Sequence, residues 1–345
     1  MPCSARVLFS RFLPRCANAP DLPVDYNHAV GNRLSVVVPI YNEAEHLDAH
    51  ITSIDEYLAA FCGGQRSYEI LAVDDGSDDG TYDVLLRARH TCSSLVVVTH
   101  PVNRGLDAAL ATGFAAASGD TIVAFDADLT YAPSTIGALV DALESTRAAV
   151  AVASAYARGG RSIGVPWLRS FLSRNANRYL SLAVRGRIAT LTCMVRAYRA
   201  DLLRSLYAPG IHHEGTFGLL FAAIKHGANV VEVPAVLDWS AQPAGRARRM
   251  RPMRIARHIA RVFRAGIKAR PFLLVAIPGL IPGLLPAVVG VALLARTSPR
   301  TLALVTAITL AVQYGSLLVL TAQLGDFAFK RRSTTSRLRR TSCTR

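Results

Sequence analysis

Short apolar runs alternate with helical patterns through the first half of the chain. Residues 34–39, 68–73, 95–99 and 121–125 form almost continuous apolar runs of strand length. Such runs are typical of strands buried on both faces of a parallel sheet. Helical patterns at residues 43–61, 81–90 and 104–117 separate them, with Asn42 as a candidate N-cap and Gly63 as a stop signal. The alternation predicts an α/β fold with a doubly wound parallel sheet, and further strands are expected at residues 149–154 and 229–234.

Acidic clusters follow two of these predicted strands. Residues 74–81 are Asp-Asp-Gly-Ser-Asp-Asp-Gly-Thr, and Asp126-Ala127-Asp128 follows the apolar run at residues 121–125. Both clusters should open at one edge of the sheet, outside the carboxyl ends of the strands, where ligands bind in this fold class. Two carboxylates spaced i, i+2 at a turn suit Mg²⁺ or Mn²⁺ together with phosphate oxygens. The alternative is an Asp-rich turn that only joins a strand to the helix beginning near Pro133.

The sequence lacks the common glycine-rich phosphate loops. Neither G-x-x-x-x-G-K-[ST] nor G-x-G-x-x-G follows the first predicted strand. Acidic side chains would repel an anionic nucleotide, so they need another role. They are expected to bind a metal, or to accept hydrogen bonds from a base or ribose.

Four motifs carry a resemblance to a known family. They are Val-Val-Pro-Ile-Tyr-Asn-Glu at residues 37–43, the acidic loop at residues 74–81, Asn-Arg-Gly-Leu at residues 103–106, and Asp-Ala-Asp-Leu at residues 126–129. In this order they resemble the inverting family 2 glycosyltransferases, and more narrowly the dolichyl- and polyprenyl-phosphate sugar transferases. The resemblance covers about residues 34–250. It implies a GT-A fold (Rossmann-like), a nucleotide-sugar donor and a divalent metal, Mg²⁺ or Mn²⁺.

The resemblance also implies roles for individual residues. The first motif would line the base pocket, the first two acids of the acidic loop would meet the base, and the last motif would face the metal and the diphosphate. In that order, the residues implied are Pro39, Tyr41, Glu43, Asp74, Asp75, Asp126 and Asp128. A metal held by the last two would stabilise the charge that builds up on the leaving diphosphate.

Arginines for the phosphates are expected from the second half of this domain. Arg174 lies in a Leu-Ser-Arg-Asn-Ala-Asn segment that resembles the family segment near the acceptor phosphate. Arg196 opens an Arg-Ala-Tyr-Arg stretch and is our candidate for a catalytic phosphate contact. Arg246 and Arg248 lie where the family has a mobile segment, and they are candidates to clamp donor or acceptor phosphate. For any single arginine, a solvated basic face is the alternative interpretation.

Two departures from the family pattern stand out. The family often places an arginine within a Ser-Arg-Tyr pattern, whereas this chain has Ser154-Ala155-Tyr156, so Arg158 or Arg161 would have to substitute. Relatives often have Gln or Ser and then His after the Asp-Leu of the metal motif. Here Thr130 and Tyr131 fill those places, so metal binding would rest on the aspartates, water and the diphosphate.

The C-terminal third predicts membrane association. Residues 241–270 form a basic segment in which one helical face is Arg/Lys-rich and the other apolar, as in an interfacial amphipathic helix. Residues 271–295 and 301–324 carry no charge, and each has the ~20 residues needed to cross a bilayer. A two-helix transmembrane hairpin is therefore predicted, with a basic tail at residues 325–345. These apolar segments decide against nucleic acid as the partner of the basic stretch, although the chain carries a net charge of +15.

Basic residues flank the apolar pair on both outer ends, which predicts that the catalytic domain and both termini are cytoplasmic. We expect an integral protein of the inner or plasma membrane, and two spans per chain are compatible with a homo-oligomer. Residues 1–33 form an Arg-rich arm for which disorder is favoured over a targeting peptide. The six cysteines are scattered, which indicates reduced thiols.

Taken together, the pattern predicts a GT-A domain at residues 34–240 on a membrane anchor. The expected reaction is inverting transfer of one sugar from a UDP- or GDP-sugar to a polyprenyl or dolichyl phosphate. Two alternatives stay open. One is a polymer-forming synthase of the same family, although the Gln-x-x-Arg-Trp segment of such enzymes is absent. The other is a non-catalytic membrane scaffold on a decayed transferase fold.

Overall fold

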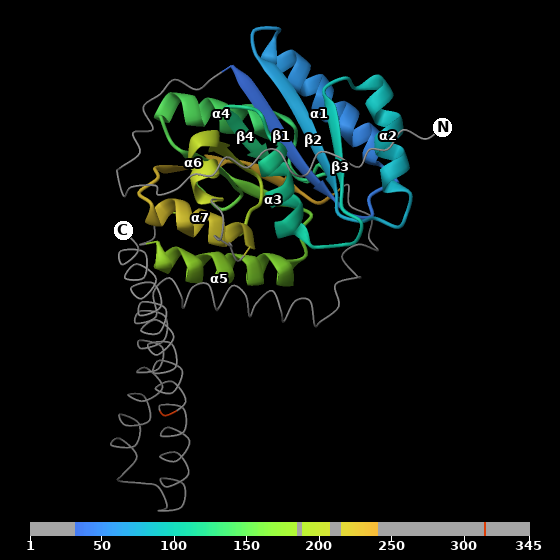
Figure 1. Cartoon of the computed structure of the whole chain (residues 1–345). Helices are drawn as coiled ribbons and strands as arrows, with labels where there is room; N and C mark the ends of the chain where they lie inside the picture. Colours follow the sequence, from blue (N-terminus) through green and yellow to red (C-terminus); the bar gives the residue numbers. More distant parts are fainter. Residues whose placement is uncertain (1–31, 185–187, 208–214, 241–313, 315–345) are drawn as a thin grey trace, which may run out of the picture.

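A mixed seven-stranded sheet forms the centre of the protein. The computed structural model describes residues 32–184, 188–207, 215–240 and 314. The strand order is β3-β2-β1-β4-β7-β5-β8 (Figure 1). In chain order the strands of this sheet are β1 (Arg33–Ile40), β2 (Ser67–Asp74), β3 (Leu95–Thr99), β4 (Thr121–Ala124), β5 (Val150–Ser154), β7 (Arg196–Arg199) and β8 (Val230–Pro234). The predicted α/β fold and the positions of six of these strands are confirmed.

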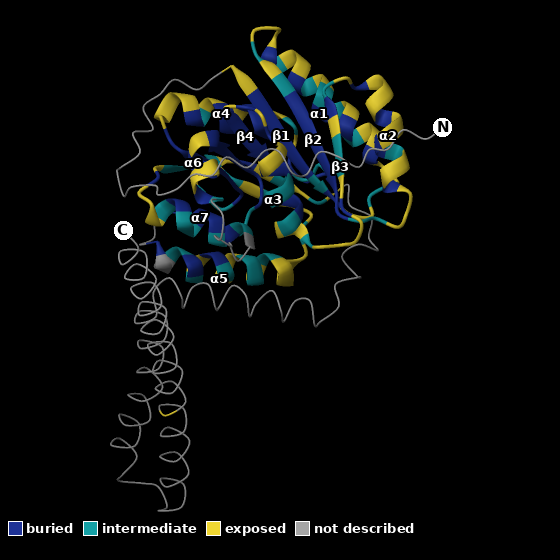
Figure 2. Ribbon diagram, viewed as in Figure 1, coloured by how far each residue is buried: buried dark blue, intermediate teal, exposed yellow. Residues whose placement is uncertain are grey.

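Strand alternation explains the continuous apolar runs. Val36 and Val38 of β1 lie in one buried cluster, whereas Val37 lies in the other. Because successive side chains of a strand point to opposite faces, a strand buried on both faces must be apolar at every position. Figure 2 shows the strands as buried between exposed helix surfaces.

Helices cover both faces of the sheet. The first cluster packs the sheet against α1 (Leu47–Cys62), α2 (Thr81–Thr91) and α4 (Ser134–Thr146). The second packs it against α3 (Leu106–Ala116), α5 (Trp167–Ala183), α6 (Ala200–Leu206) and α7 (Gly215–Lys225). Gly63 ends α1 in the left-handed conformation, as predicted, but α1 begins at Leu47 and Asn42 is not its N-cap. Asn42 itself is left-handed, with φ of 56°, and its side chain bonds Asp78 instead.

The sheet is not purely parallel, which corrects the sequence-based expectation. β7 runs antiparallel between β4 and β5, pairing Arg196 with Ala124 and with Val152. A second small sheet pairs β6 (Arg161–Ile163) with β9 (Val236–Asp238). The Asp238 backbone N–H donates to the Thr130 carbonyl at 2.8 Å, so β9 lies directly against the loop that follows β4.

The predicted membrane segments lie outside the described residues, as do Arg246 and Arg248. Within the part of the chain that the structure describes, no helix combines the length and the apolar character needed to span a bilayer. The two spans at residues 271–295 and 301–324 therefore stay a prediction, as do the interfacial segment and the terminal arms.

Candidate functional site

The carboxyl ends of β1, β2 and β4 meet at one edge of the sheet, as the acidic clusters predict. These three strands are parallel neighbours, with Ile40 opposite Asp74 and Val37 opposite Ala124. The ends of these strands and the loops that follow them carry seven of the predicted site residues. Polar side chains from separate parts of the sequence therefore gather around this edge, where open α/β sheets bind ligands.

The loop after β4 presents the two predicted metal ligands. Asp126 and Asp128 are partly buried, whereas Ala127 between them is packed in the core. Leu129 adopts a left-handed conformation with φ of 52°, and the Thr130 backbone N–H donates to Asp128 Oδ1 at 3.1 Å. The chain thus turns where the sequence predicts a turn, so two carboxylates spaced i, i+2 lie on one tight loop.

The surroundings of the Asp126 carboxyl disfavour its negatively charged form. Burial and the charge of Asp128 raise the pKa of the Asp126 carboxyl to about 7. Among the described residues, no hydrogen-bond donor reaches this carboxylate. A cation at this position would relieve both the repulsion and the missing hydrogen bonds. The donor set of two hard oxygens therefore fits a divalent metal.

His50 on α1 contacts the backbone of this loop between the two aspartates. Its Nδ1 lies 2.9 Å from the Ala127 carbonyl oxygen, and because a carbonyl only accepts, Nδ1 carries the proton. Burial lowers the pKa of His50, which favours its neutral form. Sequence reasoning missed His50, since a single histidine within an amphipathic helix carries no motif.

The loops after β1 and β2 are tied to each other. The Asn42 backbone N–H donates to Ser77 Oγ at 2.9 Å, and its side chain exchanges hydrogen bonds with Asp78. The Glu43 backbone N–H donates to Thr81 Oγ1 at 3.0 Å. These hydrogen bonds between the two loops hold the turn that carries Tyr41 at the edge of the sheet. Tyr41 is 44% exposed, and Pro39 and Glu43 beside it are partly buried. The three residues predicted to line the base pocket are thus brought together on one rigid turn.

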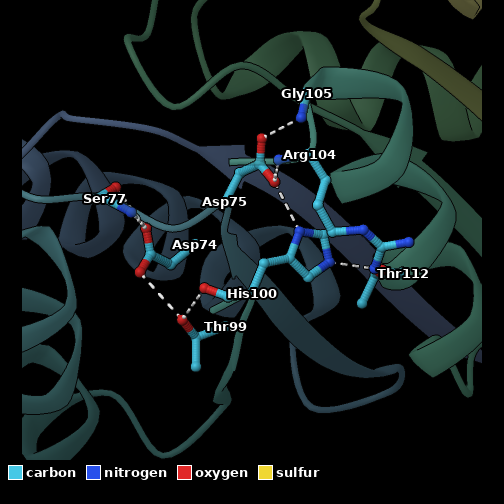
Figure 3. A network of polar contacts seen from close by, with 8 residues as sticks. All are labelled: Asp74, Asp75, Ser77, Thr99, His100, Arg104, Gly105 and Thr112. Carbon is cyan, nitrogen blue, oxygen red and sulfur yellow. Dashed lines mark hydrogen bonds and ion pairs between the residues drawn. The ribbon is translucent and has the colours of Figure 1, made fainter. Parts of the chain in front are cut away.

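The two acids at the end of β2 are buried and hydrogen-bonded (Figure 3). Asp75 accepts hydrogen bonds from the backbone N–H groups of Arg104 and Gly105, at 2.9 and 2.6 Å. Its Oδ1 also lies 2.7 Å from His100 Nδ1. Asp74 accepts from the Ser77 backbone N–H at 3.2 Å and from its hydroxyl. Both acids fix loops beside the expected base pocket, and the predicted contact with the base stays a prediction.

His100 extends this network onto α3. Its Nε2 lies 2.9 Å from Thr112 Oγ1, so each ring nitrogen has a partner (Figure 3). The loop at residues 102–103 also packs tightly on Gly76, where φ is +71° and an added Cβ would lie 2.5 Å from the Val102 carbonyl carbon. Sequence reasoning missed His100. Its position directly after a predicted strand, at the same edge as Asp75, was the signal that could have found it.

Arg169 on α5 lies close enough to Asp128, in the loop after β4, to feel its charge, and Arg174 lies on the same helix. Arg169 packs its guanidinium carbon 4.1 Å from the centre of the Trp239 ring, and Arg174 lies 5.6 Å from that of Tyr156. Burial lowers the pKa of Arg169, and the negative charge of Asp128 opposes that shift. The predicted Arg174 is therefore brought to this side of the domain. Arg169 and Trp239 join it as site residues that the motif comparison had not singled out.

Thr130 and Tyr131 do not supply a further ligand side chain. Tyr131 is 4% exposed and its hydroxyl lies 3.6 Å from Cys193 Sγ in the core. Burial raises the pKa of the Cys193 thiol to about 11, which keeps this sulfur neutral. Within the described ranges, no group of three or more His, Cys, Asp or Glu side chains is arranged to hold a metal ion. Among the described residues, Asp126 and Asp128 are therefore the candidate pair for a metal site.

Arg196 does not occupy the position that the sequence suggested. Its side chain is fully buried, and its guanidinium donates to the Leu191 carbonyl at 2.5 Å, to the Thr216 carbonyl and to the Tyr198 hydroxyl. A guanidinium enclosed by backbone carbonyls has no surface to offer a phosphate. Arg196 instead ties β7 to its neighbouring segments, which corrects its assignment as a catalytic phosphate contact.

Comparison with known proteins agrees with the motifs and the fold. The family model described as Glycosyl transferase family 2 matches residues 35–207. A polyprenol monophosphomannose synthase of Mycolicibacterium smegmatis is 32% identical over 59% of this chain and 76% of its own length. A dolichol-phosphate mannosyltransferase of Pyrococcus furiosus is 30% identical over 67% of this chain and 64% of its own length. An undecaprenyl-phosphate 4-deoxy-4-formamido-L-arabinose transferase of Serratia proteamaculans is 33% identical over 54% of each chain.

Among solved structures, a mannosyltransferase of Pyrobaculum calidifontis in complex with GDP-Man and Mn²⁺ superposes with a TM-score of 0.51. It covers 87% of this chain and 86% of its own, at 21% identity. This likeness shows the fold, the GT-A Rossmann-like arrangement. The family match covers half of the chain and carries the motifs at the sheet edge. The chain belongs to glycosyl transferase family 2 and is a glycosyltransferase.

Proposed function

We propose that this protein transfers one sugar from a nucleotide-sugar to a polyprenyl phosphate, with inversion at the anomeric carbon. The relatives named above are polyprenyl-phosphate sugar transferases, and the aligned region spans between about half and three quarters of their length. The observation that carries the proposal is the juxtaposition at one sheet edge. An acidic pair suited to a metal-bound diphosphate lies near Arg169, a cation suited to an anionic acceptor.

In this proposal, the loops after β1, β2 and β4 bind the nucleotide-sugar donor. Tyr41, which is exposed, would contact the base, and Glu43 lies on the same turn. A divalent metal bound at Asp126 and Asp128 would act as a Lewis acid toward the diphosphate leaving group. Asp128 is fixed by the Thr130 N–H, and His50 supports the loop, so the carboxylates need little reorganisation to meet a ligand.

The acceptor side needs positioning rather than a general base. A lipid phosphate is already an anion near neutral pH, so its oxygen can attack the anomeric carbon directly. Arg169 and Arg174 are held in place by the Trp239 and Tyr156 rings, and a guanidinium can bind a phosphate through two parallel hydrogen bonds. Attack from the side opposite the diphosphate would invert the configuration of the sugar.

The membrane-anchored arrangement belongs to the same proposal. Residues 271–295 and 301–324 would form a hairpin in the inner or plasma membrane, with the catalytic domain on the cytoplasmic side. A lipid acceptor gives such an anchor a purpose, because the phosphate stays at the bilayer surface.

The test is product formation in membranes that contain the full chain. UDP- and GDP-sugars would be supplied one at a time with a polyprenyl phosphate, with Mg²⁺, Mn²⁺ or a chelator. A lipid product carrying one sugar, formed only with metal, is the expected result. Chains of several sugars would instead indicate a polymer-forming synthase. Donor turnover without any lipid product would contradict the proposed acceptor.

A further inference from the structure

Helix α5 exposes large apolar side chains that the proposed chemistry does not use. Trp167, Leu168 and Phe171 are 78%, 51% and 59% exposed. Figure 2 shows the first turns of α5 as exposed, and Figure 1 places the helix at the margin of the domain, beyond α7. Side chains at i, i+4, i+7 and i+11 of a helix share a face. Trp167, Phe171, Arg174 and Arg178 have this spacing, and all four are exposed.

The charge around this face has a single sign. Between Glu144 and Asp201 the chain contains no acidic residue, whereas it contains ten arginines. The outward stripe of α5 therefore begins with aromatic side chains and continues with Arg174 and Arg178. Aromatic and basic side chains on one face of a helix are typical of a helix that lies in the headgroup region of an anionic bilayer. Protein partners with acidic surfaces would match the arginines but not the three apolar side chains next to them.

The position of the chain's exit from the described domain favours the same occupant. Trp239 packs on Arg169 of α5, and its backbone N–H donates to the Ile163 carbonyl at 2.9 Å. The described domain ends at Ser240, the next residue, and in the sequence the uncharged segments of span length follow at residues 271–295 and 301–324. The last residues of the described domain therefore lie beside the first turn of α5, and the most apolar part of the sequence follows them.

We infer that the α5 face formed by Trp167, Leu168, Phe171, Arg174 and Arg178 docks on the surface of an anionic phospholipid bilayer. Arg169 lies on the same turns of the helix and faces the electrostatic field of Asp128. Docking of this face would therefore bring Arg169 and Arg174 close to the lipid headgroups. The phosphate of a lipid acceptor lies in the same layer of the membrane. The inference rests on the proposed acceptor for its purpose, whereas the docking can be measured without any sugar transfer.

The chain's two tryptophans provide a direct test. In the Trp239→Phe variant only Trp167 fluoresces, and in the Trp167→Phe variant only Trp239 does. Each full-length variant would be reconstituted in anionic vesicles made with or without lipids brominated in the acyl chains. We expect brominated lipid to quench Trp167 emission about twofold or more, since an interfacial side chain inserts to the depth of the upper acyl chains. The partly buried Trp239 should lose much less.

Kinetics provide a second, independent readout. The double variant Trp167→Ser, Phe171→Ser should raise KM for the polyprenyl phosphate about tenfold, with KM for the nucleotide-sugar unchanged. Leu86→Ser on α2 is the matched control, because Leu86 is also exposed but lies beside Asp83 in a helix of mixed charge. It should change neither constant.

Trp167 emission that is equally bright with and without brominated lipid would overturn the inference. Protection of Trp167 from both brominated lipid and a soluble quencher would do so as well, since it would mean that the chain's own basic segment or a second copy covers the face. An inactive enzyme with quenched Trp167 would leave the docking supported and contradict the proposed reaction instead, so the two failures are distinguishable.

Discussion

The two sides of the site are built differently. On the β1–β2–β3 side, backbone N–H groups donate to side chains of neighbouring loops, and Asp75 alone receives two of them. On the α5 side, Arg169 and Arg174 rest on aromatic rings, and large apolar groups remain exposed. The first side is held by hydrogen bonds within the described chain, whereas the second leaves large apolar side chains exposed at its surface.

This difference matches what each side has to recognise in the proposed reaction. The base of a nucleotide is a rigid, planar group, and loops locked by hydrogen bonds can be preorganised for it. A long lipid is flexible, and only its phosphate needs precise placement. Arginines stacked on rings offer charge and two parallel donors with little loss of side-chain entropy. Mutations on the first side should therefore change KM for the nucleotide-sugar, and mutations on the α5 side should change the kinetic constants for the lipid phosphate.

The largest effect is expected at Asp128, which both sides share. Asp128→Asn keeps an acceptor oxygen for the Thr130 N–H but removes the charge that faces the metal and Arg169. We expect turnover to fall about 10³-fold, or about 4 kcal/mol in the barrier. Single-turnover rates with saturating donor and acceptor would measure this. Asp141→Asn on the exposed face of α4 is the control, and equal rates for both variants would contradict the metal assignment.

Asp75→Ala should mainly change stability and the donor side. The substitution leaves the Arg104 and Gly105 N–H groups and His100 Nδ1 without their acceptor in a buried setting. Unsatisfied buried donors of this kind cost about 3 kcal/mol in total, after partial relaxation. Chemical denaturation would measure the loss, and KM for the nucleotide-sugar should rise while KM for the lipid does not.

The exposed Asp78 provides the matched control for this prediction. Asp78→Ala removes only the exposed hydrogen bond that the Asn42 side-chain amide donates to the Asp78 carboxylate, and it should cost less than about 0.5 kcal/mol. If both variants were equally stable, the Asp75 network would not be holding the loop. If Asp75→Ala raised KM for the lipid instead, the division between donor and acceptor sides would be wrong.

Arg169→Lys tests the acceptor side with the charge retained. Lysine keeps the attraction to Asp128 but cannot stack a planar group on Trp239 or bind a phosphate through two parallel donors. We expect kcat/KM for the lipid phosphate to fall about tenfold, with nucleotide-sugar affinity unchanged. Arg87→Lys on the exposed surface of α2 is the control. An unchanged lipid constant would remove Arg169 from the acceptor site.

Local patterns predicted the regular half of the fold well. β3 spans Leu95–Thr99 as expected, and the acidic turns lie at the strand ends where the motifs place them. These features depend on strand alternation and turn chemistry, which are local properties of the sequence. The left-handed Gly63 that ends α1 is another case, because glycine pays no steric penalty there.

The mispredicted residues depend on contacts distant in sequence. The Arg-Ala-Tyr-Arg motif suggested Arg196 as a phosphate contact, yet its side chain is buried, and two of its guanidinium nitrogens donate to backbone carbonyls. Asn42 resembled a helix cap, but its partner is Asp78 in the next loop. The roles of His50 and His100 likewise appear only when α1 and β3 are placed against the loops they support. Polarity alone could not distinguish these buried polar groups from solvated ones.

The smallest effect is expected at Glu69, near the amino ends of β1 and β2. A substitution there tests whether hydrogen bonds also hold this end of the two strands. Glu69 Oε1 accepts hydrogen bonds from Ser35 and from the Ser118 N–H and hydroxyl, and Arg33 lies 3.5 Å from Oε2. Burial acts to raise the pKa of Glu69, but these hydrogen bonds outweigh it, so the pKa is lowered. A lowered pKa in the folded state means that the charged form stabilises the fold above the unfolded pKa of about 4.3. This contribution is lost as the pH falls through the folded pKa.

Glu69→Gln should therefore lower the free energy of unfolding by about 1 kcal/mol at pH 7. The deficit should shrink at a pH below the lowered folded-state pKa, where the wild-type carboxyl itself becomes protonated. Urea denaturation at both pH values would measure it, with Glu56→Gln on the exposed face of α1 as the control. A deficit that is the same at both pH values would mean that the shape of the side chain, rather than its charge, links β1, β2 and the α3–β4 loop. Packing rather than hydrogen bonding to a charged group would then hold the β1–β2–β3 side together. That side would differ from the arginine-rich α5 side only in how deeply its side chains are buried.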